Sequence, residues 1–171
     1  MKYVISIALL IATLTAVAVA QGRLTSDMVL AHISSVGSKQ ALKDYYAKPR
    51  WKVIQQGVAS GSDGWLKVYA SLDPVTDGEA GEDLGVALSD ALPVRPFKVL
   101  PVLSNNGKYT VERLCTFTFE VKIPDGGINA YLNRLERALG KANGKREQTM
   151  AESCRRGIQA TRAAFKNSSY Y

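Results

Sequence analysis

Between residues 25 and 103, apolar residues recur every three or four positions, which is the period of an amphipathic α-helix. Trp51, Ile54 and Val58 illustrate the pattern, which proline, glycine or serine interrupts at short intervals. Such interruptions are typical of helix ends, because proline lacks an amide donor and glycine adopts the backbone conformation that terminates helices. The pattern therefore predicts six short helices. Five of them cover residues 25–36, 39–47, 49–59, 79–92 and 96–103. The remaining one, fourth along the chain, begins at a cap formed by Ser62 or Asp63 and ends at Asp73-Pro74.

Each of these helices is expected to bury one apolar face. In the first helix, Met28, Ile33 and Val36 lie at roughly helical spacing and are the predicted inward residues. In the third and fourth helices, Trp51 and Trp65 are the largest apolar residues. We expect both tryptophans to anchor helical hairpins in the core.

The period changes between Tyr109 and Ile123, where apolar and polar residues alternate. Alternation is typical of a β-strand. No other segment offers a partner strand, and an isolated strand cannot satisfy its own backbone hydrogen bonds. We therefore expect an extended segment at 109–123 laid across helices, pairing at most briefly with itself or with another copy.

Helical spacing returns in two further segments, 128–139 and 145–165. The second of these places Met150, Cys154, Ile158, Thr161 and Phe165 on one stripe. Short loops between helical hairpins favour a compact or slightly curved bundle. The predicted fold is all-α, in a single domain over residues 21–171.

The chain has two cysteines, Cys115 and Cys154. In an oxidising compartment the expected pairing is one disulfide, closing a loop of about 40 residues and stabilising the fold by roughly 4 kcal/mol. A zinc site is the first alternative, but His32 is the only histidine and two thiols do not complete a zinc shell. A redox pair is the second, although such pairs usually occur as CxxC.

The first twenty residues predict a secretory signal peptide. Lys2 precedes an apolar run from Val4 to Leu14, and Ala18-Val19-Ala20 is a small-residue cleavage site. The run is shorter than the roughly 20 residues that a spanning helix needs. We expect cleavage after Ala20 and a periplasmic or secreted mature protein that does not span a membrane.

Basic residues outnumber acidic ones, 22 to 15, giving a net charge of +7. This charge suits an anionic partner, but the predicted compartment and the absence of a recognition motif argue against nucleic acid. The C-terminal third is the most basic part of the chain. Its lysines and arginines are Arg134, Arg137, Lys141, Lys145, Arg146, Arg155, Arg156, Arg162 and Lys166.

No catalytic constellation is apparent. The loop from Asp73 to Leu84 matches an EF-hand at three positions but places Val75 and Leu84 where oxygen ligands are required. No histidine is placed to activate a serine, because His32 is typical of a structural histidine in a helix. Carboxylates that could serve hydrolysis do not stand out from surface charges: Glu79, Glu82, Asp83, Glu112 and Glu120. We expect no cofactor, no metal and no enzymatic activity.

Two groups of residues are candidates for binding a partner. Tyr45, Tyr46 and Tyr69 cluster around the tryptophan hairpins, and exposed tyrosines commonly anchor protein interfaces. The second group consists of basic residues on the last predicted helix, which suit an anionic surface. These are Arg155, Arg156 and Arg162.

The run W-x2-I-x2-G-V-A-S-G at 51–61, followed by W-L-x-V and P-x-T-D at 65–77, resembles a family of small secreted helical proteins of proteobacteria. The resemblance continues through Leu84, Ala87 and Leu88. It implies a bacterial periplasm and a helical fold, and it carries no established activity. In size, secretion and helicity the chain is also loosely similar to periplasmic immunity proteins, which neutralise toxins from rival cells.

The resulting hypothesis is a non-enzymatic periplasmic protein that works through contact with another protein, as immunity and inhibitor proteins do. The first alternative is an envelope-associated protein that binds anionic lipid or glycan through its basic C-terminal face. The second alternative is a hydrolase that depends on carboxylates.

Overall fold

The computed structural model describes residues 23–104, 110–117, 119 and 122–169. Over these residues the fold is entirely helical, as predicted, and contains no strand. The predicted signal peptide lies outside the described residues. The elements are α1 (Ser26–Val36), α2 (Ser38–Tyr45), α3 (Pro49–Ala59), α4 (Asp63–Leu72), the 3-10 turn η1 (Asp73–Val75), α5 (Gly78–Ala91), α6 (Pro96–Ser104), α7 (Val111–Leu114), α8 (Gly127–Leu139) and α9 (Gly144–Phe165).

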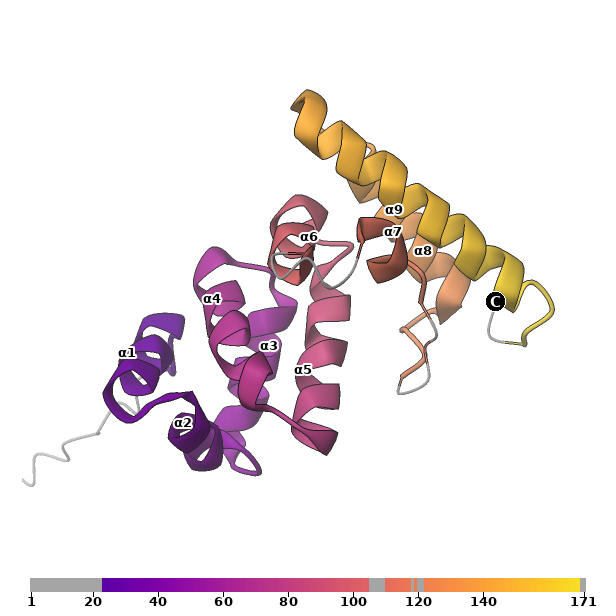
Figure 1. Cartoon of the computed structure of the whole chain (residues 1–171). Helices are drawn as coiled ribbons and strands as arrows, with labels where there is room; N and C mark the ends of the chain where they lie inside the picture. The colour runs from indigo at the N-terminus through magenta and orange to yellow at the C-terminus, as the bar shows by residue number, and fades with distance from the viewer. Residues whose placement is uncertain (1–22, 105–109, 118, 120–121, 170–171) are drawn as a thin grey trace, which may run out of the picture.

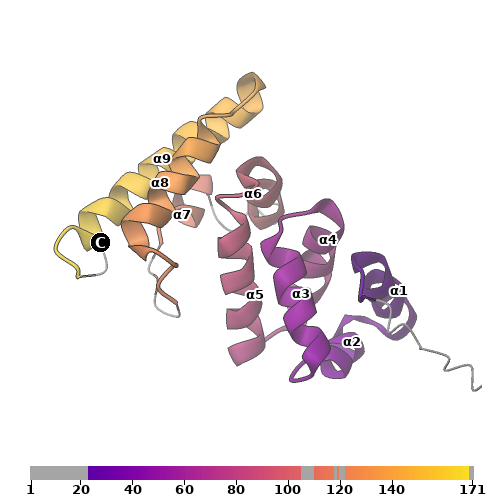
Figure 2. The same cartoon turned by 180° about the vertical axis from the view of Figure 1, so that it is seen from behind.

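The helices form two groups (Figures 1 and 2). Helices α1 to α6 pack as hairpins, with α3 alongside α5 and α1 against α4. Helices α8 and α9 form a long pair beyond α6, and α7 packs closely against α9. Helix α6 contacts α7, α8 and α9, so it is a main link between the two groups.

The two tryptophans hold the first group together in different ways. Trp51 on α3 is buried, and its indole N–H donates to the carboxylate of Asp83 on α5 at 2.7 Å. Trp65 on α4 is partly buried and packs over Gly57 of α3, where any side chain would overlap its ring. Because Gly57 lacks a Cβ, the α3–α4 hairpin closes tightly.

The predicted disulfide between Cys115 and Cys154 is confirmed. It joins the end of α7 to the middle of α9 with a Cα–Cα distance of 5.1 Å, and both residues are fully buried. Beside it, Gly157 lies so close to α7 that an added Cβ would overlap the Glu112 carbonyl oxygen and lie 2.8 Å from the Cys115 carbonyl carbon. One turn further along α9, the Thr161 hydroxyl accepts the Phe117 amide at 2.9 Å.

The prediction of an extended segment over 109–123 is wrong for residues 111–114, which form helix α7. Thr110 caps this helix, because its hydroxyl accepts the Arg113 amide at 3.3 Å. The alternating pattern concealed a second spacing, since Val111, Leu114 and Cys115 also lie three and four residues apart. Residues 109, 118, 120 and 121 of the predicted segment lie outside the described residues.

The predicted inward face of α1 is also partly wrong. Met28 and Val36 are exposed, at 50% and 39% of their surface, whereas Val29 and Ile33 are buried. Val29 and Ile33 are four residues apart and form the face that meets α4 and α2. A short helix with several apolar residues offers two possible stripes, and packing against its neighbours decides between them.

We predict that Gly157→Ala destabilises the protein by about 1–3 kcal/mol, because the new methyl group forces α7 away from α9. Gly85→Ala is the matched control: a Cβ there meets nothing within 4 Å, so the substitution should stabilise the helix by about 0.5–1 kcal/mol. Urea unfolding of both variants with the disulfide intact measures the difference. A Gly157→Ala protein as stable as the parent would show that the α7–α9 contact is not tight.

Candidate functional site

The tyrosines proposed for partner binding lie mostly in the core. Tyr45 and Tyr69 are buried, at 6% and 8% exposure, and the Tyr69 hydroxyl donates to Asp73 at 2.9 Å. Burial, followed by the charge and hydrogen bond of Asp73, raises the pKa of Tyr69. Tyr46 is half-buried, and its hydroxyl donates to Glu79 at 2.8 Å. All three therefore stabilise the α2–α5 region.

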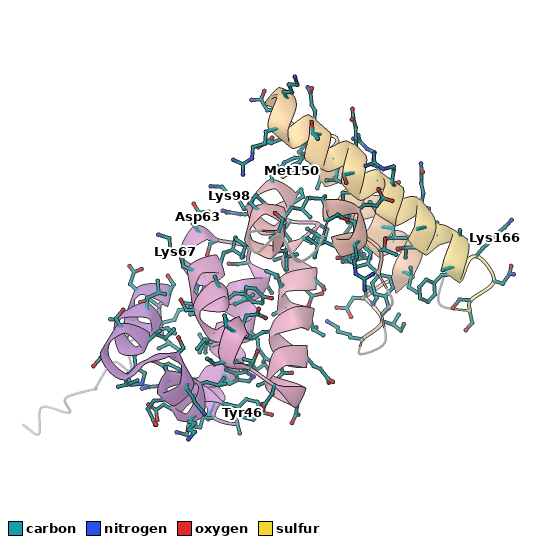
Figure 3. All side chains as sticks on the ribbon, in the orientation of Figure 1. Tyr46, Asp63, Lys67, Lys98, Met150 and Lys166 are labelled. Atoms are coloured by element: carbon teal, nitrogen blue, oxygen red, sulfur yellow. A yellow bond between two sulfur atoms is a disulfide. The ribbon has the colours of Figure 1, made fainter. Side chains whose placement is uncertain are left out.

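The arginines proposed for partner binding lie along α9, and two of them connect it to its neighbours. Arg156 pairs with Glu112 of α7 at 2.7 Å. Arg162 reaches α8, where it contacts Asn129, Asn133 and Glu136. Arg155 is half-buried. In Figure 3, Tyr46 lies at the foot of the first helix group, whereas Lys166 lies at the C-terminal end of α9 in the second group. The tyrosines belong to the first helix group and the arginines to α9.

A groove between the two helix groups gathers a different set of basic residues. We call it the cationic groove; its volume is about 570 Å³. One wall is the α5–α6 turn with the start of α6, and the other is the end of α8 with the turn into α9. Its lining residues are Pro93, Val94, Arg95, Pro96, Phe97, Lys98, Arg134, Arg137, Ala138, Lys141 and Glu147.

Most of the charge in the cationic groove is not used inside the protein. The side chains of Arg95, Arg137 and Lys141 are exposed and make no hydrogen bond or ion pair with the described residues. Lys98 pairs with Asp63 of α4 at 3.2 Å, near the surface (Figure 3). Surface pairs of this kind contribute little stability and exchange readily with water or a partner.

The two remaining charged residues of the groove have local partners. The Arg134 guanidinium donates to the Asp125 carbonyl oxygen at 3.4–3.5 Å and lies 6.0 Å from the centre of the Tyr131 ring. The carboxylate of Glu147 accepts the Asn143 amide at 2.7 Å, at the start of α9. The groove therefore presents five cations against one carboxylate that already accepts a hydrogen bond.

Local sequence explains why these cations share one groove. On α8, Leu132, Leu135 and Leu139 are fully buried, and the basic residues occupy the opposite stripe of the helix. At the other wall, Pro93 follows the end of α5 and Pro96 begins α6, where its fixed φ suits the first helical position. The tight turn between these prolines leaves Val94 60% exposed and Arg95 in solvent.

A second, smaller cavity of about 340 Å³ lies between α5 and the start of α8. Its remaining wall consists of Thr116, Phe117, Phe119, Lys122 and Pro124. We call this cavity the aromatic cleft. The rings of Phe117 and Phe119 stack at 5.3 Å, and Tyr131 meets both of them edge-on. Phe119 has a φ of 51°, an uncommon conformation for a bulky residue, which the packed rings hold in place.

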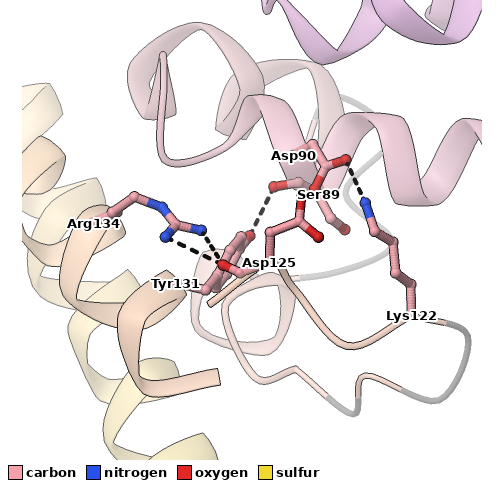
Figure 4. A network of polar contacts seen from close by, with 6 residues as sticks. All are labelled: Ser89, Asp90, Lys122, Asp125, Tyr131 and Arg134. Carbon is pink, nitrogen blue, oxygen red and sulfur yellow. Dashed lines mark hydrogen bonds and ion pairs between the residues drawn. The ribbon is translucent and has the colours of Figure 1, made fainter. Parts of the chain in front are cut away.

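Hydrogen bonds across the aromatic cleft fasten the second helix group to α5 (Figure 4). The Tyr131 hydroxyl donates to the Ser89 carbonyl oxygen at 2.8 Å, and Lys122 pairs with Asp90 at 3.2 Å. Burial raises the pKa of Tyr131, with a smaller contribution from Asp90, so the hydroxyl stays protonated and remains a donor.

Glu82, one of the carboxylates considered for hydrolysis, lines the aromatic cleft together with Asp90, which was not in the predicted set. The two lie eight residues apart on α5, which is about 12 Å along the helix axis. Glycosidase carboxylates lie roughly 5–9.5 Å apart, and Asp90 is already paired with Lys122. Glu79, Asp83 and Glu112 have the partners described above, and Glu120 lies outside the described residues.

Other features considered from the sequence have structural roles. The loop around Asp73 consists of η1 and the start of α5. His32 lies 2.8 Å from Asp44 and meets the Tyr45 ring edge-on. Within the described residues, no group of three or more histidine, cysteine or acidic side chains is placed to hold a metal ion. No helix in the same part of the chain has the length and hydropathy needed to cross a membrane.

Comparison of the chain with protein-family models, with curated proteins and with solved structures found no match. The resemblance to small secreted helical proteins therefore stays a prediction. The function has to be inferred from the geometry of the molecule.

We predict that Tyr131→Phe lowers the free energy of unfolding by about 1 kcal/mol, because it removes the part-buried hydrogen bond to the Ser89 carbonyl, which then keeps only the longer bond from the Leu92 amide. Tyr46→Phe is the control, since it removes a hydrogen bond that water replaces at the surface. Urea unfolding compares the two variants. Equal effects would show that the hydrogen bond across the aromatic cleft does not stabilise the fold.

Proposed function

We propose that this protein is a non-enzymatic binding protein that acts outside the cytoplasm, of the immunity or inhibitor kind, with the cationic groove as its docking surface. The partner is another protein that presents an acidic surface. Such a role requires specific contact and no chemical groups for catalysis. It also agrees with the signal peptide that the sequence predicts.

The observation that carries this proposal is the convergence of five cations from two separate helix groups on one groove. Like charges held close together repel one another in the free protein, and an acidic partner removes that repulsion on binding. Complementary charge of this kind speeds association and excludes wrong partners. Among the described residues, no side chain pairs with the charged groups of Arg95, Arg137 or Lys141.

Apolar residues in the groove favour a protein as the partner. Val94 is one of three large apolar side chains that are exposed among the described residues, and Phe97 is partly buried beside it. Protein interfaces combine such apolar anchors with arginines, surrounded by a polar rim. An acidic protein surface with apolar residues at its centre complements both features.

An anionic lipid or glycan surface is the second candidate, and the outer side of α9 favours it. Lys145 and Arg146 near its start, and Lys166 after its end, are exposed. A long exposed helix can lie along a flat charged surface, which a concave groove cannot do. This candidate requires the cations of α9 and does not use the groove.

We predict that reversing two groove charges, in an Arg137→Glu, Lys141→Glu variant, weakens partner binding at least about tenfold. Immobilised protein would capture partners from an envelope extract, and calorimetry would then measure the affinity of each captured protein. The control is Arg50→Glu, Lys52→Glu on α3, which makes the same change in charge at two exposed positions far from the groove.

Capture of the same protein with unchanged affinity by the groove variant would contradict the proposal. Phosphatidylglycerol vesicles provide the other arm of the test. The lipid candidate would be favoured if the groove variant binds these vesicles as the parent does and the double variant Arg146→Glu, Lys166→Glu does not.

A further inference from the structure

The basic residues of the cationic groove are spaced at about one helical turn. Arg134, Arg137 and Lys141 lie three and four residues apart, at the end of α8 and in the turn after it. The Lys141 amide donates to the Ala138 carbonyl at 3.1 Å, so the chain keeps a helical course to this point. At 1.5 Å per residue the three positions span about 10 Å, with a mean step of about 5 Å.

The opposite wall provides a second, shorter row of cations. Arg95 and Lys98 are three residues apart, on either side of the first turn of α6. Apolar atoms of Val94, Phe97 and Ala138 line the groove together with the two rows. The surface thus has positive charge along both walls and apolar atoms in the lining.

From this arrangement we infer that the groove binds an acidic amphipathic helix of the partner protein. The inference rests on the proposed function and specifies the segment that docks. An amphipathic helix carries an apolar stripe, and acidic residues on both sides of that stripe repeat about once per turn, near 5.4 Å. Helix-in-groove docking of this kind is a recurrent mode of peptide recognition.

Other anionic ligands fit the arrangement less well. In an extended strand with alternating pattern, acidic and apolar side chains point to opposite faces, so they cannot both enter the groove. A single phosphate group is compact, whereas the cations spread over about 10 Å of helix. A bilayer surface is flat and does not enter a concave site. Glu147, at one end of the groove, further opposes a dense cluster of negative charge.

The test uses two synthetic peptides of 15 residues with the same charge. One is a lactam-stapled helix with leucines at positions i, i+3, i+4 and i+7 and with glutamates on both sides of that stripe. The other replaces two central residues with proline, which prevents a helix. Calorimetry measures the binding of both to the full mature protein, with its disulfide intact, at two salt concentrations.

The stapled helix is expected to bind at least about tenfold more tightly than the proline peptide, with affinity that falls as salt rises. Two variants should each reduce the affinity for the stapled helix at least about tenfold: the double variant Arg137→Glu, Lys141→Glu and the single variant Val94→Asp. The control double variant Arg50→Glu, Lys52→Glu should leave this affinity unchanged. All of these positions are exposed, and circular dichroism with thermal unfolding confirms that each variant is folded.

Equal binding of both peptides would overturn the inference, since charge alone would then suffice. Absence of binding by the stapled helix at millimolar concentration would also overturn it, as would displacement of the helix by phosphatidylglycerol vesicles. The proposed function is tested separately, by capture of the natural partner from the envelope extract. If the groove variant loses that partner, the proposed function stands even when the peptide results overturn the inference. If the groove variant captures the partner with unchanged affinity, the proposed function fails.

Discussion

The close approach of α7 to α9 is the contact on which the second half of the structure depends. Gly157 allows the backbone of α7 to reach α9, and the disulfide between Cys115 and Cys154 fixes the contact covalently. Thr161 extends it by binding the Phe117 amide. Helix α9 in turn holds α8 through Arg162. Because α6 packs against all three helices, this contact sets where the end of α8 stands relative to α6.

The cationic groove follows from that placement. Its two walls belong to segments about 40 residues apart in sequence, and their positive charges would separate if each helix group were independent. Hydrophobic burial of the leucines on α8 and the hydrogen bonds across the aromatic cleft hold the groups together. The basic residues of the groove are therefore brought together by contacts made elsewhere, and the proposed acidic partner would meet a preformed site.

Much of the fold could be predicted from the sequence because the signals are local. Prolines at 49 and 96 start helices, and the apolar spacing fixes the helical segments to within one or two residues. The disulfide could be predicted from compartment and composition. Helix α7 could not, because its helical spacing covers a single turn inside an alternating pattern, and packing against α9 decides between the two. The exposed Met28 shows the same limit, since only neighbouring helices decide which stripe of α1 is buried.

The candidate site could be predicted only in part, because tyrosine serves the core as readily as an interface. Tyr45 and Tyr69 are buried, and both continue an apolar stripe at helical spacing, Tyr45 with Ala41 and Tyr69 with Leu72, which favours the core. The basic character of the C-terminal third was visible, including Arg137 on the polar stripe of α8 and Lys141 in the turn after it. Their meeting with Arg95 depends on tertiary contacts between distant segments, which no spacing along the chain reveals.

We propose that a partner docks between α6 and α8. Nuclear magnetic resonance of the labelled protein, titrated with a captured partner, would locate the contact residue by residue. We expect the largest shifts on Val94, Arg95, Phe97, Arg137 and Lys141. Shifts concentrated on the outer side of α9, or around Tyr46 and the α2–α3 turn, would contradict it.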